Sequence, residues 1–265
     1  MIKLAVVGKD VSKSASPQIH LFIAKNLGVE ITYDKVSIPE EEFESRVEGL
    51  LKEYDGMNFT IPYKLTVIPH LNKISGDAEV FGAVNTVVSS TKTGSNTDGL
   101  GFMQMLSAAG VLVKGKKVLL LGAGGAGRSV AKKLLDGGAQ VEIYDRFMQN
   151  AQNVAKEFGG ITVLDDVTPH KVDIIVNATG VGMHKTEGIS PVGEDVLSLC
   201  DTAVDLIYVP KQSEFLRIAA SLNKKTVNGA SMLFYQAYYS DCYYFGLTPD
   251  PAVAAKLYEE YAKIY

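Results

Sequence analysis

Residues Gly122–Gly127 read Gly-Ala-Gly-Gly-Ala-Gly and match the spacing G-x-G-x-x-G. They follow the apolar run Lys117–Leu121 and precede a stretch with helical periodicity. In this setting the first glycine allows a tight turn, the second lets the backbone approach a diphosphate, and the third lets the helix pack closely on the strand. The free N–H groups of the helix N-terminus favour an anion. The sequence therefore predicts a dinucleotide site at Gly122, Ala123, Gly124, Gly125, Ala126 and Gly127, with a glycine-rich helix entry that binds no ligand as the alternative.

Two charged neighbours follow the glycine loop at the end of the next expected strand. A carboxylate such as Asp145 hydrogen-bonds the adenosine ribose in NAD-binding proteins and repels a 2′-phosphate. Arg146 is adjacent, and an arginine near this position can accommodate that phosphate. The pair leaves NAD and NADP both open, and a solvated strand end is the third interpretation.

Four polar clusters lie in the first hundred residues, at expected strand ends or turns. Ligands of open α/β sheets bind at such ends. Each cluster also has a simpler explanation: Ser16 before Pro17 predicts an N-cap followed by an N1 proline, and Asp98 could cap a helix that begins at Leu100. The clusters are Ser14–Pro17, Asn58–Lys64, Gly82–Thr86 and Gly94–Gly99.

Short apolar runs alternate with amphipathic stretches along most of the chain, which indicates an α/β fold with parallel sheets and helices on their faces. We expect strands at 2–7, 31–37, 57–60, 117–121, 140–144, 173–177, 202–206 and 226–228, and a hairpin from 84–90 and 93–97. We expect helices at 17–27, 40–53, 64–71 and 125–136, and two tyrosine-rich helices at 230–245 and 251–264. The stretch 110–117 is the expected junction between two α/β units.

Composition sets limits on the class of protein. The chain has 265 residues, of which 46% are hydrophobic and 21% are charged, as expected of a globular protein that can bury a core. The net charge of -4 does not fit the basic surface of a nucleic-acid binder. We expect no nucleic-acid partner. The sequence leaves monomer and homodimer open.

Cysteine and histidine usage argues against a disulfide framework and against a metal site. Cys200 and Cys242 form no C-x-x-C pair, which indicates inert thiols in a reducing compartment. The N-terminal apolar run is too short for a signal-peptide core or a membrane span. No metal-ligand spacing connects the histidines, which are His20, His70, His170 and His184. We therefore expect a cytoplasmic protein with no metal and no membrane partner.

The polar clusters and the glycine loop occur in an order that resembles the motif series of shikimate dehydrogenases. The series S-x-S-P, N-x-T-I-P-x-K, G-A-V-N-T and N-T-D-G-x-G-F precedes G-A-G-G-A-G-R. Asn177–Met183 is similar to the family's N-A-T-x-x-G-M, Asp205–Pro210 to its D-x-x-Y-x-P, and Gly229–Gln236 to its G-x-x-M-L-x-x-Q. The resemblance covers essentially the whole chain.

The resemblance implies two α/β domains and an enzyme that reduces 3-dehydroshikimate to shikimate in aromatic amino acid biosynthesis. Residues 1–100 with 230–265 would form the substrate-binding domain, with the C-terminal helices returning to it, and residues 101–229 a Rossmann-type domain. Lys64 and Asp98 would be the catalytic pair. Substrate contacts would come from Ser14, Ser16, Thr60, Asn85, Tyr208 and Gln236. Cofactor contacts would come from the glycine loop and from Asp145, Arg146, Thr179 and Met232.

The cofactor implied by the family is NADP, but this chain departs from the family's pattern. Typical NADP-using members read Asn-Arg-Thr where this chain has Asp145, Arg146 and Phe147, and often carry another basic residue shortly after. Here the next residues are Met-Gln-Asn. The departure favours NAD or dual use.

Three other functions remain open on the same residues. A quinate dehydrogenase, which oxidises quinate to 3-dehydroquinate with NAD, differs only in the ring pocket. A methylenetetrahydrofolate dehydrogenase shares the two-unit plan but does not explain S-x-S-P and N-T-D-G. A non-catalytic dinucleotide-sensing protein would be expected to lose Lys64 and Asp98, and both are present.

Overall fold

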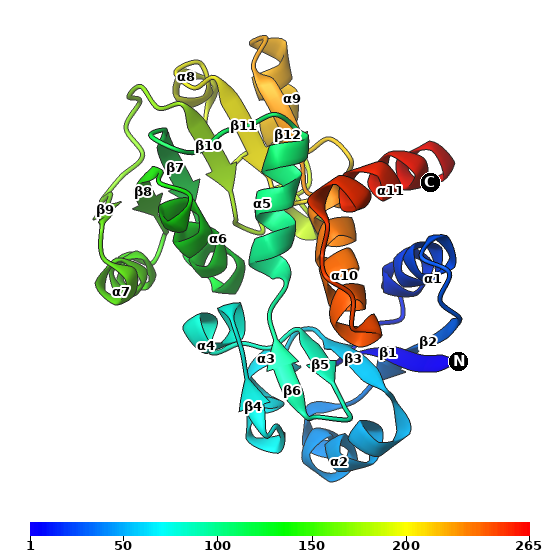
Figure 1. Cartoon of the computed structure of the whole chain (residues 1–265). Coiled ribbons are helices and arrows are strands. Elements are labelled where there is room, and N and C mark those ends of the chain that lie inside the picture. The colour runs from blue at the N-terminus through cyan, green and yellow to red at the C-terminus, as the bar shows by residue number, and fades with distance from the viewer. The chain divides into compact units, whose positions relative to one another are not determined.

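The computed structural model describes residues 1–265, and the chain divides into two compact units, each with a six-stranded sheet. The first unit comprises Met1–Gly101 and Phe234–Tyr265, and the second comprises Phe102–Leu233. The chain passes from one unit to the other within helix α5 (Asp98–Ala108) and returns within α10 (Ala230–Phe245) (Figure 1).

The first sheet is mixed, with strand order β2-β1-β3-β5-β6-β4. Strand β1 pairs in parallel with β2 on one side and with β3 on the other. The order in which successive strands are added to the sheet therefore reverses at β1. The hairpin of β5 and β6 adds two antiparallel pairings. The strands are β1 (Ile2–Gly8), β2 (Ile31–Ser37), β3 (Gly56–Phe59), β4 (Lys73–Ile74), β5 (Thr86–Val88) and β6 (Thr93–Ser95).

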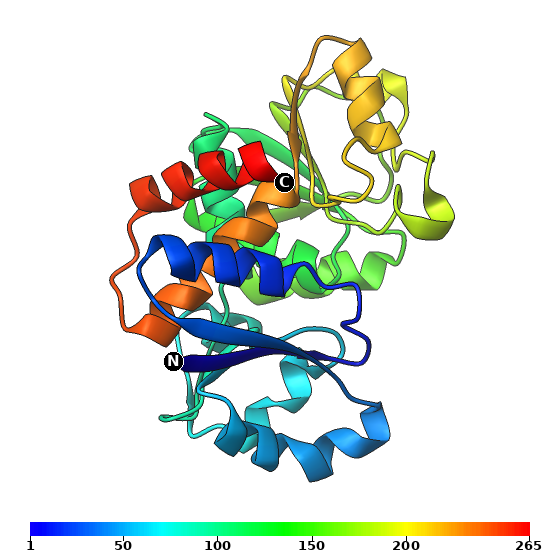
Figure 2. The ribbon, with the colours of Figure 1, turned by 90° about the vertical axis from the view of Figure 1, so that its right-hand side faces the viewer.

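Helices cover both faces of this sheet, with α1 on one face and α2 on the other (Figure 2). Helix α2 buries Phe43, Val47, Leu50 and Leu51, the i, i+4, i+7, i+8 spacing of one helical face. This face packs against β3 in the core of the unit. The helices that lie wholly in this unit are α1 (Ser16–Asn26), α2 (Phe43–Glu53), α3 (Tyr63–Thr66), α4 (Asp77–Phe81), α11 (Pro251–Ile264) and the 3-10 turns η1 (Glu40–Glu42) and η2 (Ile68–His70).

The tyrosine-rich tail is part of the core of the first unit. Tyr235, Tyr238 and Tyr239 are buried, and α11 contacts α1. Gly56 in β3 leaves room for the ring of Tyr244, because a Cβ at position 56 would lie 2.4 Å from that ring. The prediction that the C-terminal helices return to the first domain is confirmed.

The second sheet is fully parallel, with strand order β12-β11-β10-β7-β8-β9. Strand order reverses between β7 and β10, which is the switch point where doubly wound sheets bind ligands. The strands are β7 (Lys117–Leu121), β8 (Gln140–Tyr144), β9 (Ile161–Val163), β10 (Ile174–Asn177), β11 (Thr202–Asp205) and β12 (Lys225–Asn228). The Rossmann-type prediction is confirmed.

Continuous burial of the central strands explains their uninterrupted apolar sequences. Leu119, Leu121 and Ile175 belong to a core that α8 and α9 help to close, as expected when both faces of a parallel sheet are covered. The helices of this unit are α6 (Gly125–Asp136), α7 (Met148–Phe158), α8 (Glu194–Leu197), α9 (Glu214–Ser221) and the 3-10 turn η3 (His184–Thr186).

Three sequence expectations about local structure are wrong. The stretch 110–117 is no junction, because Val111 and Val113 are buried and Gly115 N donates to Gly138 O at 2.8 Å, both within the second unit. Ser16 is not an N-cap, because α1 begins at Ser16 itself and no side chain caps it. The helix that was expected to begin at Leu100 is α5, which begins at Asp98. Asp98 therefore lies within the helix and does not precede it as a cap.

The structure carries neither a transmembrane helix nor a metal cluster. All helices are too short or too polar to cross a lipid bilayer, and no three His, Cys, Asp or Glu side chains gather as metal ligands. Both cysteines are free and buried, and burial raises the pKa of each thiol to about 11. Neither thiol is therefore ionised near neutral pH.

Candidate active site

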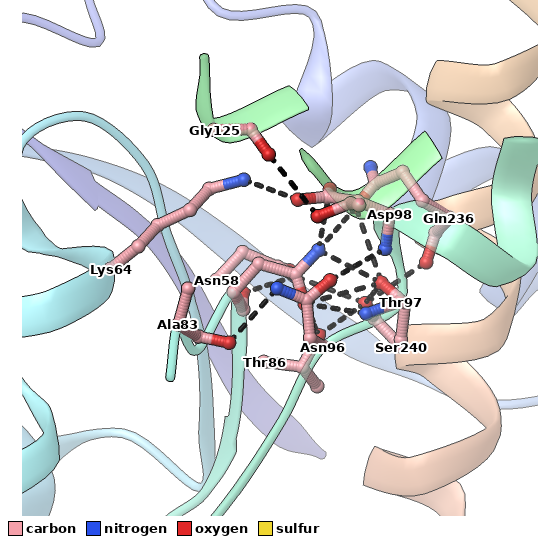
Figure 3. Close-up of polar contacts among 12 residues, drawn as sticks. Asn58, Lys64, Ala83, Thr86, Asn96, Thr97, Asp98, Gly125, Gln236 and Ser240 are labelled. Carbon is pink, nitrogen blue, oxygen red and sulfur yellow. Dashed lines mark hydrogen bonds and ion pairs between the residues drawn. The ribbon is translucent and has the colours of Figure 1, made fainter. Parts of the chain in front are cut away.

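Lys64 and Asp98 meet in the first unit. Lys64 Nζ donates to Asp98 Oδ2 at 2.6 Å (Figure 3). Their side chains are 29% and 24% exposed, so the pair is shielded but reachable by a ligand. An ammonium held beside a carboxylate can donate a proton to an adjacent oxygen and stabilise negative charge there.

Helix α3 places Lys64 because the preceding tyrosine anchors it. Tyr63 is 1% exposed, and its ring stacks on Phe43 with centroids 4.2 Å apart. The backbone of Lys64 is also fixed, since Val84 N donates to Lys64 O at 2.7 Å. The buried tyrosine therefore sets the direction in which the following lysine leaves the chain.

Asn85 orients the carboxylate of Asp98. Asn85 Nδ2 donates to Asp98 Oδ1 at 2.9 Å, and the amide oxygen of Asn85 accepts from Thr97 N at 2.9 Å. Gln236 Oε1 of α10 lies 3.3 Å from the same Nδ2. These contacts bring together Lys64, Asp98, Asn85 and Gln236, four of the residues singled out in the sequence. Figure 3 shows Lys64, Asp98 and Gln236 of this group.

The remaining first-unit candidates follow β1 and β3 in the chain. These are neighbouring parallel strands, and the strand order of the first sheet reverses at them. Ser14 Oγ donates to Ser16 Oγ at 3.1 Å. Thr60 N donates to Val7 O at 3.0 Å. The Thr60 side chain also lies close to the Gly8 backbone, because a Cβ at Gly8 would lie 2.6 Å from Thr60 Cγ2. Ser14, Ser16 and Thr60 thus lie at the carboxyl ends of neighbouring strands.

The glycine loop fits a dinucleotide diphosphate. Gly122 has φ +97°, and a Cβ at Gly127 would lie 2.0 Å from Gly122 O, so both positions require glycine. Gly124, Gly125 and Ala126 are exposed, and a Cβ at Gly124 or Gly125 would meet no atom within 4 Å. The first turn of α6 has neither an acidic residue nor a side-chain cap. Open space and uncapped N–H groups are what an anion needs at a helix start.

Asp145 contacts the glycine loop directly. Its Oδ2 accepts from Ala123 N at 2.7 Å, and its Oδ1 accepts from Phe147 N at 2.9 Å. The guanidinium of Arg146 lies over the ring of Phe147, 4.7 Å from its centroid, and the arginine is exposed. The carboxylate therefore shapes the loop, while the arginine is accessible to a ligand.

A buried aspartate joins two further motifs of the second unit. Asp205 Oδ1 accepts from Asn177 Nδ2 at 3.0 Å, and burial raises the pKa of its carboxyl group. Thr179 Oγ1 donates to Asn177 Oδ1 at 2.6 Å. Of the other second-unit candidates, Tyr208 is 44% exposed and Met232 is half-buried.

Several polar residues that support the Lys64–Asp98 pair carried no predicted role. Asn58 Nδ2 donates to Asn85 O and to Ser240 Oγ, each at 3.1 Å. Tyr33 OH donates to Asn58 Oδ1 at 2.8 Å. Asn58 belongs to a motif that the sequence singles out, but 182 residues separate it from Ser240, so no local pattern could connect them.

Two family models match the chain. The shikimate dehydrogenase substrate binding domain matches residues 6–87, and the shikimate / quinate 5-dehydrogenase model matches residues 106–186. The first match covers the strands that lead to Lys64. The second covers the glycine loop and Asp145.

Relatives match over nearly the full length. A shikimate dehydrogenase (NADP(+)) of Thermus thermophilus is 37% identical over 254 residues, 95% of each chain. That of Carboxydothermus hydrogenoformans is 35% identical over 265 residues, 95% of this chain and 94% of its own. A crystal structure of a Thermus thermophilus shikimate 5-dehydrogenase in complex with NADP(H) and shikimate has a TM-score of 0.88, with 35% identity over 98% of this chain and 99% of that one.

The doubly wound sheet with its glycine loop and the mixed sheet with its lysine–aspartate pair define a two-unit α/β oxidoreductase of the dinucleotide-binding class. The full-length matches narrow that class. The chain belongs to the shikimate dehydrogenase family.

Proposed function

We propose that the protein catalyses the reversible reduction of 3-dehydroshikimate to shikimate with a nicotinamide cofactor. The Lys64–Asp98 pair carries this proposal, because its 2.6 Å contact places a proton donor among hydrogen-bonding side chains suited to a polyhydroxy ring. The relatives' names and the shikimate complex of the Thermus thermophilus enzyme support this substrate.

Substrate binding and cofactor binding belong to different parts of the chain. Residues 1–100 with 230–265 bind the substrate, and residues 101–229 bind the dinucleotide. The lysine–aspartate pair in the first unit and the glycine loop in the second support this division.

Lys64 is the proton donor in the reductive direction. The bound nicotinamide supplies the hydride. As the ketone oxygen gains negative charge, the Lys64 ammonium stabilises it and transfers a proton to it. Asp98 orients the lysine through the 2.6 Å contact, and Asn85 holds the aspartate through its 2.9 Å contact.

The remaining first-unit candidates bind the substrate. Ser14 and Ser16 donate hydrogen bonds to its carboxylate, and Thr60, Asn85 and Gln236 hydrogen-bond the ring hydroxyls or the carboxylate. Tyr208 is included among the substrate contacts on the family resemblance alone. The contact between Asn85 and Gln236 supports placing these two amides on one ligand.

The cofactor is NADP, with NAD accepted as well. The names of the Thermus thermophilus and Carboxydothermus hydrogenoformans relatives support NADP, and the exposed Arg146 provides a positive charge for a 2′-phosphate. Asp145 opposes that phosphate. A relative from Listeria monocytogenes, crystallised with shikimate and NAD, is 26% identical with a TM-score of 0.85. Thr179 and Met232 complete the proposed cofactor contacts.

Nicotinamide absorbance with purified protein tests the proposal. Shikimate and quinate are each supplied with NADP and with NAD, in four separate assays. We expect turnover of shikimate with NADP, and slower turnover with NAD. Faster turnover of quinate than of shikimate would assign the chain to the quinate branch, and bound cofactor without turnover in any assay would leave a non-catalytic dinucleotide-binding protein.

A further inference from the structure

The side-chain amide of Asn85 has two ends that differ in chemistry but hardly in shape. The backbone of this residue is fixed, since Asn85 N donates to Ser95 O at 3.1 Å and Asn85 O accepts from Phe59 N at 2.9 Å. Asn85 is buried. A half-turn of the amide would exchange its acceptor oxygen and its NH2 donor in nearly the same space. The donors and acceptors around it must therefore decide which end faces Asp98.

The NH2 group of Asn85 is the end that faces Asp98. Asn85 Nδ2 donates to Asp98 Oδ1 at 2.9 Å. With the amide reversed, its oxygen would meet this carboxylate oxygen, and two acceptors form no hydrogen bond. The NH2 group would then meet the backbone N–H of Thr97, which now donates to Asn85 Oδ1 at 2.9 Å. Only the observed direction lets the amide hold Asp98.

Thr86 supplies a second donor to the amide oxygen. Thr86 Oγ1 donates to Asn85 Oδ1 at 2.8 Å, and Thr86 is 1% exposed. Asn58 Nδ2, which can only donate, lies 3.4 Å from the same hydroxyl oxygen. A hydroxyl has one proton, so the contact with Asn58 uses a lone pair and leaves the proton for Asn85. Ser240 Oγ lies 2.7 Å from Thr86 Oγ1 (Figure 3).

We propose that Thr86 is a positioning residue for substrate binding, which holds the amide of Asn85 with its NH2 group towards Asp98. This inference rests on the proposed function, in which Asn85 hydrogen-bonds the substrate. Thr86 is buried and acts through Asn85. Its effect is to order the amide before the ligand arrives, which reduces the cost of ordering the site on binding.

The Thr86→Val variant replaces the hydroxyl with a methyl group. We expect it to fold, because Asn85 Oδ1 keeps its bond from Thr97 N and Ser240 Oγ still donates to Gln236 O at 3.0 Å. Its Kd for shikimate, measured by titration calorimetry without cofactor, should rise by about three- to tenfold. In steady-state assays KM should rise by a similar factor.

Two variants distinguish the hydrogen bond from packing. Thr86→Ser keeps the hydroxyl and removes the methyl group, and it should bind shikimate within about twofold of the wild type. Thr202→Val makes the same exchange as Thr86→Val at a buried residue of β11 in the second unit, and it should leave Kd and KM unchanged. Equal weakening in Thr86→Ser and Thr86→Val would show that the methyl group matters instead of the hydroxyl, and would overturn the inference.

Asn85→Ala and the Thr86→Val/Asn85→Ala double variant separate the inference from the proposed function. If Thr86 acts through Asn85, the double variant binds shikimate about as weakly as Asn85→Ala alone. Multiplied effects in the double variant contradict the inference. An unchanged Kd in Thr86→Val, with weakened binding in Asn85→Ala, overturns the role of Thr86 and leaves the proposed substrate contact intact. Unchanged binding in Asn85→Ala overturns that contact, and the positioning role with it.

Discussion

At the scale of single residues, Asp145 combines a structural contact with a proposed role in cofactor choice. One carboxylate oxygen accepts from Ala123 N in the glycine loop and the other accepts from Phe147 N, at 2.7 and 2.9 Å. Its negative charge remains next to the exposed Arg146. Structure and selectivity therefore involve the same side chain, and an amide in its place keeps one of the two acceptor oxygens while its NH2 group replaces the other.

Asp145→Asn is expected to shift the cofactor preference towards NADP. Removing the charge removes its repulsion of a 2′-phosphate, so the ratio of kcat/KM with NADP to that with NAD should rise by about tenfold. Steady-state assays at constant ionic strength measure the ratio. Asp136→Asn, which changes the same charge at the end of α6, is the control and should leave it unchanged. An unaltered ratio in Asp145→Asn would mean that the carboxylate does not affect cofactor choice.

At the scale of elements, neighbouring strands of the second sheet are joined by a small charged cluster. Glu142 on β8 lies 2.8 Å from Lys117 Nζ on β7 and 2.6 Å from His170 Nε2. The hydrogen bond to Glu142, followed by one to the backbone of Thr168, raises the pKa of His170. The folded state therefore favours the protonated imidazole.

This cluster predicts a pH-dependent contribution to stability. A histidine whose folded pKa is raised stabilises fully below its unfolded pKa of about 6.5, and loses that contribution as the pH rises through the folded value. The deficit of His170→Gln in free energy of unfolding should thus be larger at pH 6 than at pH 8.5, by about 0.5–1 kcal/mol. Denaturant unfolding at both pH values measures it. In a Glu142→Gln background the difference should shrink, because the backbone bond to Thr168 still raises the pKa of His170, and an undiminished difference there would rule out this pair as the main source.

The elements that could be predicted from sequence are those with strong local signals. Strands β7 and β8 and helix α6 begin and end as expected, because buried parallel strands are continuously apolar and the glycine loop marks the helix start. Strand β4 has two residues and α4 has five, too few to show periodicity. The contact between His20 Nδ1 and Asp241 Oδ1 joins positions 221 residues apart. Only the packing of α10 in the first unit brings these two residues together.

At the scale of the whole molecule, the two proposed binding tasks fall in different units. The residues around Lys64 and Asp98 belong to the first unit, and the glycine loop belongs to the second. The motif series could indicate this division because the four polar clusters all precede the glycine loop in the chain. The order of the mixed sheet and the return of α10 depend on tertiary contacts, and only the family resemblance predicted the return.

The division predicts that cofactor binding can be lost without losing substrate binding. Gly124 has φ -70°, and a Cβ at this position would project into open space, so Gly124→Val should fold. Its side chain would occupy the space proposed for the diphosphate, and the Kd for NADP should rise by at least about tenfold. Calorimetry should show an unchanged Kd for shikimate without cofactor. Equal weakening of both ligands would contradict independent sites.

The central claim is that Lys64 transfers the proton in shikimate oxidation and 3-dehydroshikimate reduction. The most direct measurement is kcat for shikimate in wild-type protein and in Lys64→Ala, with Lys52→Ala as a control for loss of an exposed lysine. We expect Lys64→Ala to lower kcat by about 10²–10⁴ with a smaller effect on the Kd for shikimate, and Lys52→Ala to match the wild type. A Lys64→Ala enzyme with unchanged kcat would remove Lys64 from the mechanism.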